Sequence, residues 1–178
     1  MIRNRDIIVI GTSVGGVEAL ERLCAALPAD LPAALLIVIH TRPSPWSRLD
    51  EVLGRVAPLP VRFAVDGEAI ERSRIYVAPP DLHLVVRDGH VSLQRGPREN
   101  GHRPAVDPLF RSTARYYGAR TIGVVLTGGR DCGAAGMEVI QACGGVTVVQ
   151  EPGDAVCGDM PRSALARIRP HYVVSLAS

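Results

Sequence analysis

IIVIGTSVGG, residues 7–16, is the stretch that decides the fold of this chain. Its first four residues form a short apolar run rich in β-branched side chains, which is typical of a strand buried on both faces of a parallel sheet. A glycine-punctuated turn follows, and residues 17–27 then repeat apolar side chains at helical spacing. A second buried run, 34–39, ends at His40. The segment therefore predicts a right-handed β-α-β unit with two parallel strands.

The rest of the chain continues this alternation of strand and helix patterns. Helical patterns cover 44–56, 107–117, 133–142 and 161–167. Strand patterns cover 61–65, 121–126, 146–150 and 172–176, and 75–93 reads as short strands that include a hairpin. The rhythm predicts an α/β fold: a doubly wound, mostly parallel sheet with helices on both faces and a small β-hairpin excursion. At 178 residues, we expect one domain over 1–178.

Composition and charge argue against several functional classes. The formal net charge is only +2 and the basic residues are scattered, so we expect no nucleic-acid partner. No apolar run approaches the roughly 20 residues of a membrane span, and no signal-peptide pattern is present, so we expect no membrane insertion. The four cysteines lack CxxC and CxxH spacing. We therefore expect reduced thiols in a cytoplasmic protein, with neither a metal nor a cofactor.

The turn Gly11-Thr12-Ser13-Val14-Gly15-Gly16 admits three interpretations. In the first, Ser13 is a nucleophile on a strand-to-helix turn, because the spacing matches G-x-S-x-G. In the second, the turn binds a dinucleotide. That fingerprint needs glycine in place of Ser13 and an acidic residue after the second strand, where this chain has His40. In the third, Ser13 only caps the helix.

His40 favours the nucleophile interpretation. It ends the strand predicted to neighbour the strand before Ser13, and adjacent parallel strands lie about 4.8 Å apart. An unperturbed histidine has a pKa near 6.5, so at neutral pH it is mostly uncharged and can accept the serine proton. The order serine then histidine, with no acid between them, disfavours the ordinary α/β-hydrolase fold. We therefore expect Ser13 as nucleophile and His40 as general base.

Stretches along nearly the whole chain carry a resemblance to a known family. Beside the first turn and the strand ending at His40, they are VDGEAI, IYVAPPDLHL, GHRPAVDPLFRSTA, VVLTG followed by GAAGM, and MPRSAL. In their order and spacing, the chain resembles the CheB-type protein-glutamate methylesterase domain.

The resemblance implies a doubly wound parallel sheet and hydrolysis of glutamate γ-methyl esters on the cytoplasmic helices of methylated chemoreceptors. Glutamine deamidation accompanies this activity in many members. The resemblance also implies Ser13 as nucleophile and His40 as base, with no cofactor. Backbone amides near Val14 and Gly129 would hold the oxyanion.

The third catalytic residue departs from the family pattern. The family has an aspartate immediately before the glycine that opens the helix after Leu-Thr-Gly; here Cys132 holds that place and Asp131 stands one step earlier. Either Asp131 orients His40 through a local backbone shift, or Ser13 and His40 act as a pair and Asp131 caps the helix. Cys132 also raises the alternative of a catalytically weakened homologue that binds receptors or a signalling partner.

Further expectations concern the surroundings of this site. The chain begins at the catalytic domain, so we expect a stand-alone member without a receiver domain. Trp46 is expected to form a wall of the substrate cleft. Surface or structural roles are expected for the other histidines, His83, His90, His102 and His171. Either surface solvation or attraction of an acidic receptor helix is expected for the arginines Arg98, Arg103 and Arg111.

Overall fold

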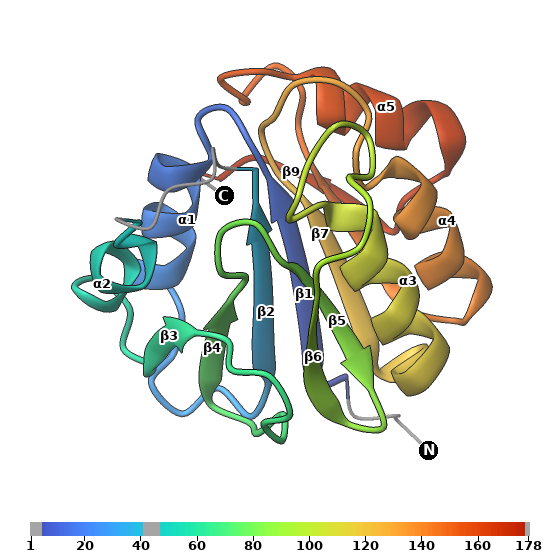
Figure 1. Ribbon diagram of the computed structural model, residues 1–178. Helices are drawn as coiled ribbons and strands as arrows, with labels where there is room; N and C mark the ends of the chain where they lie inside the picture. The colour runs from blue at the N-terminus through green and yellow to red at the C-terminus, as the bar shows by residue number, and fades with distance from the viewer. Residues whose placement is uncertain (1–4, 41–46, 177–178) are drawn as a thin grey trace.

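The computed structural model describes residues 5–40 and 47–176. Within these ranges, one seven-stranded sheet has the order β3-β4-β2-β1-β7-β8-β9, and every neighbouring pair is parallel. Its strands are β1 (Ile7–Thr12), β2 (Ala34–Ile39), β3 (Val61–Phe63), β4 (Arg74–Val77), β7 (Thr121–Val125), β8 (Val146–Gln150) and β9 (Tyr172–Val174). The predicted doubly wound parallel sheet is confirmed (Figure 1).

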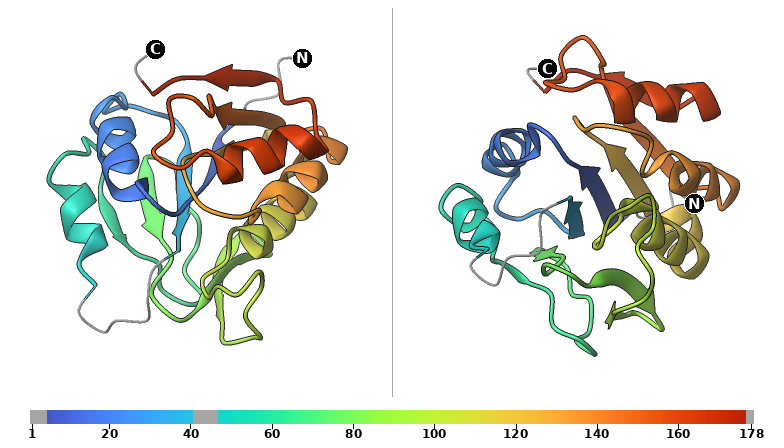
Figure 2. Two further views of the ribbon diagram at one scale, coloured as in Figure 1. Left: turned by 90° about the horizontal axis from the view of Figure 1, so that it is seen from above. Right: turned by 45° about the horizontal axis from the view of Figure 1, so that its top comes forward.

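Helices cover both faces of this sheet (Figures 1 and 2). On one face lie α1 (Gly16–Ala25) and α2 (Leu49–Gly54). On the other lie α3 (Val106–Tyr117), α4 (Ala134–Ala142) and α5 (Asp159–Arg167), with the short 3-10 turn η1 (Gly118–Arg120) after α3. No helix in the described ranges is long and apolar enough to cross a membrane.

The expected hairpin excursion is formed by β5 (His83–Arg87) and β6 (His90–Gln94), which pair with each other antiparallel and not with the main sheet. Its apolar side chains, including Leu84 and Val91, join the same core as Phe110 of α3. The hairpin therefore extends the α3 side of the molecule, and the loop after β6 runs back toward the carboxyl ends of the strands (Figure 1).

Strand alternation divides the interior into two cores. Val9, Leu36 and Val38 belong to the core under α3, whereas residues one step along each strand belong to the core under α1. Gly11 pairs with Val38 and Thr12 with Ile39. Continuing this register by one residue brings Ser13 beside His40, both on the face toward α3.

Element bounds differ from the predicted ones by one or two residues at helix and strand ends; β3 ends at Phe63 and β9 at Val174, each two residues early. The strands over 34–39 and 146–150 match the prediction residue for residue. Helix α5 begins at Asp159, two residues before Pro161, because proline is tolerated in the first helical turn. Helix α2 ends at Gly54. Its expected start at 44 lies outside the described residues.

Candidate active site

Ser13 sits on a tight turn between β1 and α1. Its amide donates to the Thr127 carbonyl oxygen (2.9 Å), and its own carbonyl oxygen accepts from the Gly16 amide (2.9 Å). Gly15 has a φ of 74°, and a Cβ there would lie 2.6 Å from the Val156 Cβ, so the turn requires glycine. Gly15 is also the N-cap of α1, and no side chain caps that helix. The interpretation of Ser13 as a helix cap is therefore wrong.

His40 follows β2 directly and lies alongside this turn. Its amide donates to the Thr12 carbonyl oxygen (3.1 Å), which continues the β1–β2 ladder to the residue before Ser13. Both ring nitrogens are buried, and neither has a hydrogen-bond partner among the residues that the structure describes. Burial, with a smaller contribution from His102, lowers the pKa of His40 to about 3. The ring is therefore a neutral proton acceptor at pH 7.

The loop between β7 and α4 closes the other side of Ser13. The Thr127 hydroxyl donates to the Val14 carbonyl oxygen (2.8 Å) and accepts from the Cys157 amide (2.9 Å). A Cβ on Gly128 would lie 2.9 Å from the Ser13 Cβ and would overlap the Met160 sulfur. Only glycine at 128 therefore lets this backbone lie against the serine.

Two backbone amides beside Ser13 are free to bind an anion. In the described part of the chain, neither the Val14 amide nor the Gly129 amide donates a hydrogen bond. Val14 follows Ser13 on the first turn, and Gly129 follows Gly128, whose backbone contacts Ser13. Such unpaired N–H groups next to a nucleophile are what an oxyanion site requires.

The structure does not bring Asp131 to His40. Asp131 is exposed, and the N-cap of α4 is Gly133, with no side-chain cap. Cys132, in contrast, is 1% exposed, and its sulfur accepts from the Val106 amide (3.2 Å). Burial raises the pKa of the Cys132 thiol, which keeps it protonated at neutral pH. Asp131 as third catalytic residue therefore stays a prediction.

His102 is the site residue that the sequence did not single out. Its ring stacks on the His40 ring, with 3.7 Å between centroids and 3° between planes. Burial first, and then Arg130 and Arg98, lower the pKa of His102. The surface-or-structural expectation holds for His83, which is buried and bonds Pro97 and Ala105. For His102 the available signal was its place in the GHRP stretch.

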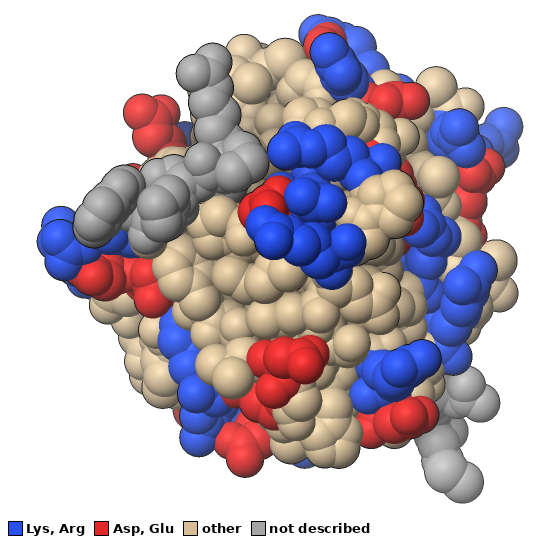
Figure 3. All heavy atoms as spheres, in the orientation of Figure 1, with Lys and Arg blue, Asp and Glu red and all other residues tan. Residues whose placement is uncertain are grey.

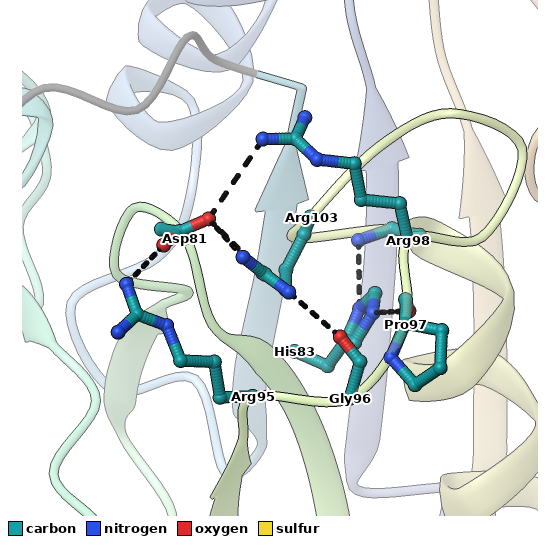
Figure 4. Close-up of polar contacts among 8 residues, drawn as sticks. Asp81, His83, Arg95, Gly96, Pro97, Arg98 and Arg103 are labelled. Carbon is teal, nitrogen blue, oxygen red and sulfur yellow. Dashed lines mark hydrogen bonds and ion pairs between the residues drawn. The ribbon is translucent and has the colours of Figure 1, made fainter.

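Basic side chains surround one carboxylate near this site. Asp81 accepts from Arg95 and Arg103, and Arg98 lies 4.0 Å away (Figure 4). Hydrogen bonds from Arg95 and then Arg103 lower the pKa of Asp81 to about 2. In Figure 3 basic atoms gather over the loop between β6 and α3. Asp81 therefore holds these three guanidinium groups together, and its single charge leaves the cluster net positive.

Arg111 and Trp46 are the remaining residues that the sequence associated with this site. Arg111 is bonded to Glu99 by one guanidinium nitrogen (2.8 and 2.9 Å). Trp46, the expected cleft wall, lies outside the described residues. Among residues 5–40 and 47–176, no three His, Cys, Asp or Glu side chains group in a way that could hold a metal ion.

Comparisons with known proteins identify the family of the chain. A family model described as CheB methylesterase matches residues 8–178. A protein-glutamate methylesterase/protein-glutamine glutaminase of Methanosarcina mazei is 38% identical over 97% of this chain and 49% of its own length. A Leptospira interrogans relative is 36% identical over 97% of this chain and 90% of its own. This chain thus spans about half the length of the Methanosarcina relative.

A solved structure shows the same arrangement of strands and helices. The Thermotoga maritima CheB methylesterase catalytic domain is 32% identical, with a TM-score of 0.91, over 96% of this chain and 93% of that one. Both the family model and the relatives cover the turn at Ser13 and the strand end at His40. The chain therefore belongs to the CheB methylesterase family.

Proposed function

We propose that this chain hydrolyses glutamate γ-methyl esters on methylated chemoreceptors, with Ser13 as nucleophile and His40 as general base. The observation that carries the proposal is the adjacency of Ser13 and His40 at the carboxyl ends of two paired parallel strands. Relatives named protein-glutamate methylesterase/protein-glutamine glutaminase support the reaction class and add glutamine deamidation as a second reaction.

In the proposed reaction, Ser13 Oγ attacks the ester carbonyl carbon while His40 takes the hydroxyl proton. The tetrahedral oxyanion is stabilised by the amides of Val14 and Gly129. Methanol leaves with the proton returned from His40. Water then attacks the acyl-enzyme, with His40 again as base, and releases the free glutamate side chain and Ser13.

No hydrogen bond joins Ser13 to the His40 ring in the described residues, because both ring nitrogens lack partners. Catalytic hydrogen bonds are commonly long or misaligned without substrate and shorten in the complex. In the proposal, bound substrate brings Ser13 Oγ to His40.

The testing experiment measures methanol release from methylated chemoreceptor by the wild type and by Ser13→Ala. We expect release by the wild type and its loss in the variant, and we expect Ser13 to react with a fluorophosphonate probe. No methanol from several methylated receptors, together with no labelling of the folded wild type, would contradict the proposal.

A second candidate function is a catalytically weakened homologue that binds methylated receptors without turnover. Two points favour it. The resemblance to the family puts Cys132 in the place of its aspartate, and burial lowers the pKa of His40 to about 3, well below the pH at which a base works best. Receptor binding without methanol release or probe labelling would support this second function.

A further inference from the structure

A catalytic histidine needs something to fix its ring, and the usual restraint is missing here. The χ2 torsion of histidine has broad, roughly two-fold preferences, so the rotamer alone does not choose between ring orientations. A hydrogen bond to one nitrogen normally does. Neither nitrogen of His40 has such a bond among the described residues, and Asp131 is exposed.

Contact with a second ring restricts the plane of the His40 ring instead. The rings of His40 and His102 lie parallel within 3°, at 3.7 Å between centroids. Rotating the His40 ring about χ2 would drive its edge into His102. We propose that His102 is a positioning residue that fixes the plane of the His40 ring beside Ser13. This inference rests on the proposed function.

The turn that carries His102 is itself rigidly built. Glu99 and His102 exchange two backbone hydrogen bonds (3.0 and 2.8 Å) around Asn100 and Gly101, which have φ values of 51° and 81°. Positive φ at both central residues, with the sequence Asn-Gly, is the signature of a type I′ hairpin turn. The His102 backbone therefore has a fixed place and direction.

A buried carboxylate anchors this turn to two helices. Asn100 donates to Asp107 (2.7 Å), and the other oxygen of Asp107 accepts from the Gly136 amide (2.6 Å). Asp107 is 2% exposed and lies in the first turn of α3, whereas Gly136 lies in the first turn of α4. Both helix starts thus hold the loop that places His102 over His40.

Charge around the pair keeps the stack neutral. Two imidazolium rings at this separation would repel each other, so protonation of one ring opposes protonation of the other. Arg98 and Arg130 lower the pKa of His102, and His102 lowers the pKa of His40. Other titratable groups near the turn include Glu99, paired with Arg111, the buried Asp107 and Cys132, and Asp81, which pairs with Arg98 and Arg103.

The test compares His102→Ala, which removes the stack, with His102→Phe, which keeps a flat ring and removes the titration. The exposed His90→Ala serves as a matched control. With methylated receptor as substrate, we expect kcat of His102→Ala to fall about tenfold with KM within about twofold, because a misplaced base affects the chemical step. His102→Phe should recover most of kcat, and His90→Ala should match the wild type.

A second readout does not depend on activity. The His40 ring is titrated by NMR through its carbon-bound ring protons, in wild type and in His102→Phe. We expect the midpoint to move to higher pH in the variant, because the charge that opposes His40 protonation is gone. This measurement remains decisive if His102→Ala fails to fold.

Three results would overturn the inference: full kcat in His102→Ala, kcat in His102→Phe as low as in His102→Ala, or an unchanged His40 midpoint. Failure of the proposed function would look different. In that case the wild type itself would release no methanol, whereas the His40 midpoint would still report whether the two rings are coupled.

Discussion

The two ends of the parallel sheet differ in whether a buried polar group has hydrogen-bond partners. At the amino end, the Asp6 carboxylate is 1% exposed and accepts hydrogen bonds from the guanidinium groups of both Arg72 and Arg120. At the carboxyl end, both nitrogens of the His40 ring are buried with no partner in the described part of the chain. Among the described residues, the Asp6 carboxylate is satisfied and the His40 ring has no partner.

This difference separates stability from function. A satisfied buried carboxylate ties three segments together, since Asp6, Arg72 and Arg120 precede β1, β4 and β7. An unsatisfied buried imidazole costs folding free energy and persists where a site uses it. Substitutions at the amino end should therefore change stability, and substitutions at the carboxyl end should change activity.

The largest expected effect is on activity, in His40→Phe. Removal of the proposed general base should lower kcat by about 10³-fold, whereas the free energy of unfolding should stay the same or rise, because two buried ring nitrogens leave the interior. Methanol release and urea unfolding measure the two quantities. A marked loss of stability would show that the His40 nitrogens form hydrogen bonds in solution, which would contradict the contrast with Asp6.

Gly128→Ala should have the next largest effect. The added methyl would collide with the Ser13 Cβ and the Met160 sulfur, pushing the oxyanion loop away from the nucleophile. We expect kcat/KM to fall about 100-fold, as for a displacement of about 1 Å in a catalytic group. Gly54→Ala, at the end of α2, is the matched control for the added methyl, because its Cβ would meet only the Val61 Cβ, at 3.9 Å. Equal losses in the two variants would contradict the steric explanation.

Asp6→Asn should reverse the pattern seen at His40. Loss of the charge that Arg72 and Arg120 share should lower the free energy of unfolding by about 2 kcal/mol, while kcat stays within about twofold. Denaturant unfolding and methanol release check the two parts. Asp88→Asn, at an exposed turn, provides the control for the same chemical change. A large loss of activity in folded Asp6→Asn would show that the amino and carboxyl ends of the sheet are energetically coupled.

The two ends should also differ in their response to acid. The pKa of His40 is about 3 when folded and about 6.5 when unfolded, so the unfolded chain binds the extra proton and stability falls as pH drops from 6.5 toward 3. The slope for one such group is about 1.4 kcal/mol per pH unit. The pKa of Asp6 is lowered below 3.8, so its stabilisation is lost only below that pH.

Urea unfolding at a series of pH values measures this dependence. In His40→Phe the decline between pH 6 and pH 4 should become shallower, because one of the buried imidazoles that resist protonation is gone. The His102 ring, whose pKa is also lowered, should leave part of the slope in place. An identical slope in wild type and variant would place the acid sensitivity elsewhere.

The sequence predicted the site residues that strand register brings together, but not the residues that loops place. The pairing of Ser13 with His40 follows from two buried strands in register, which apolar runs reveal. The places of His102 and Asp131 depend on loops that only tertiary bonds fix. The dipeptide Asn100-Gly101 predicts a turn. The orientation of that turn depends on the hydrogen bond from Asn100 to Asp107, and no local sequence pattern predicts this bond.

The smallest expected effect tests Asp131, for which the sequence leaves open whether it orients His40. If Asp131 orients His40 as in a triad, Asp131→Asn should lower kcat by about 10⁴-fold, as in serine proteases. Because Asp131 is exposed and His40 has no bond to it, we expect a change of less than about twofold. Methanol release at pH 7 from one receptor preparation decides between them. A large loss would mean that the β7–α4 loop moves on substrate binding, bringing the carboxylate to the ring that His102 holds in its absence.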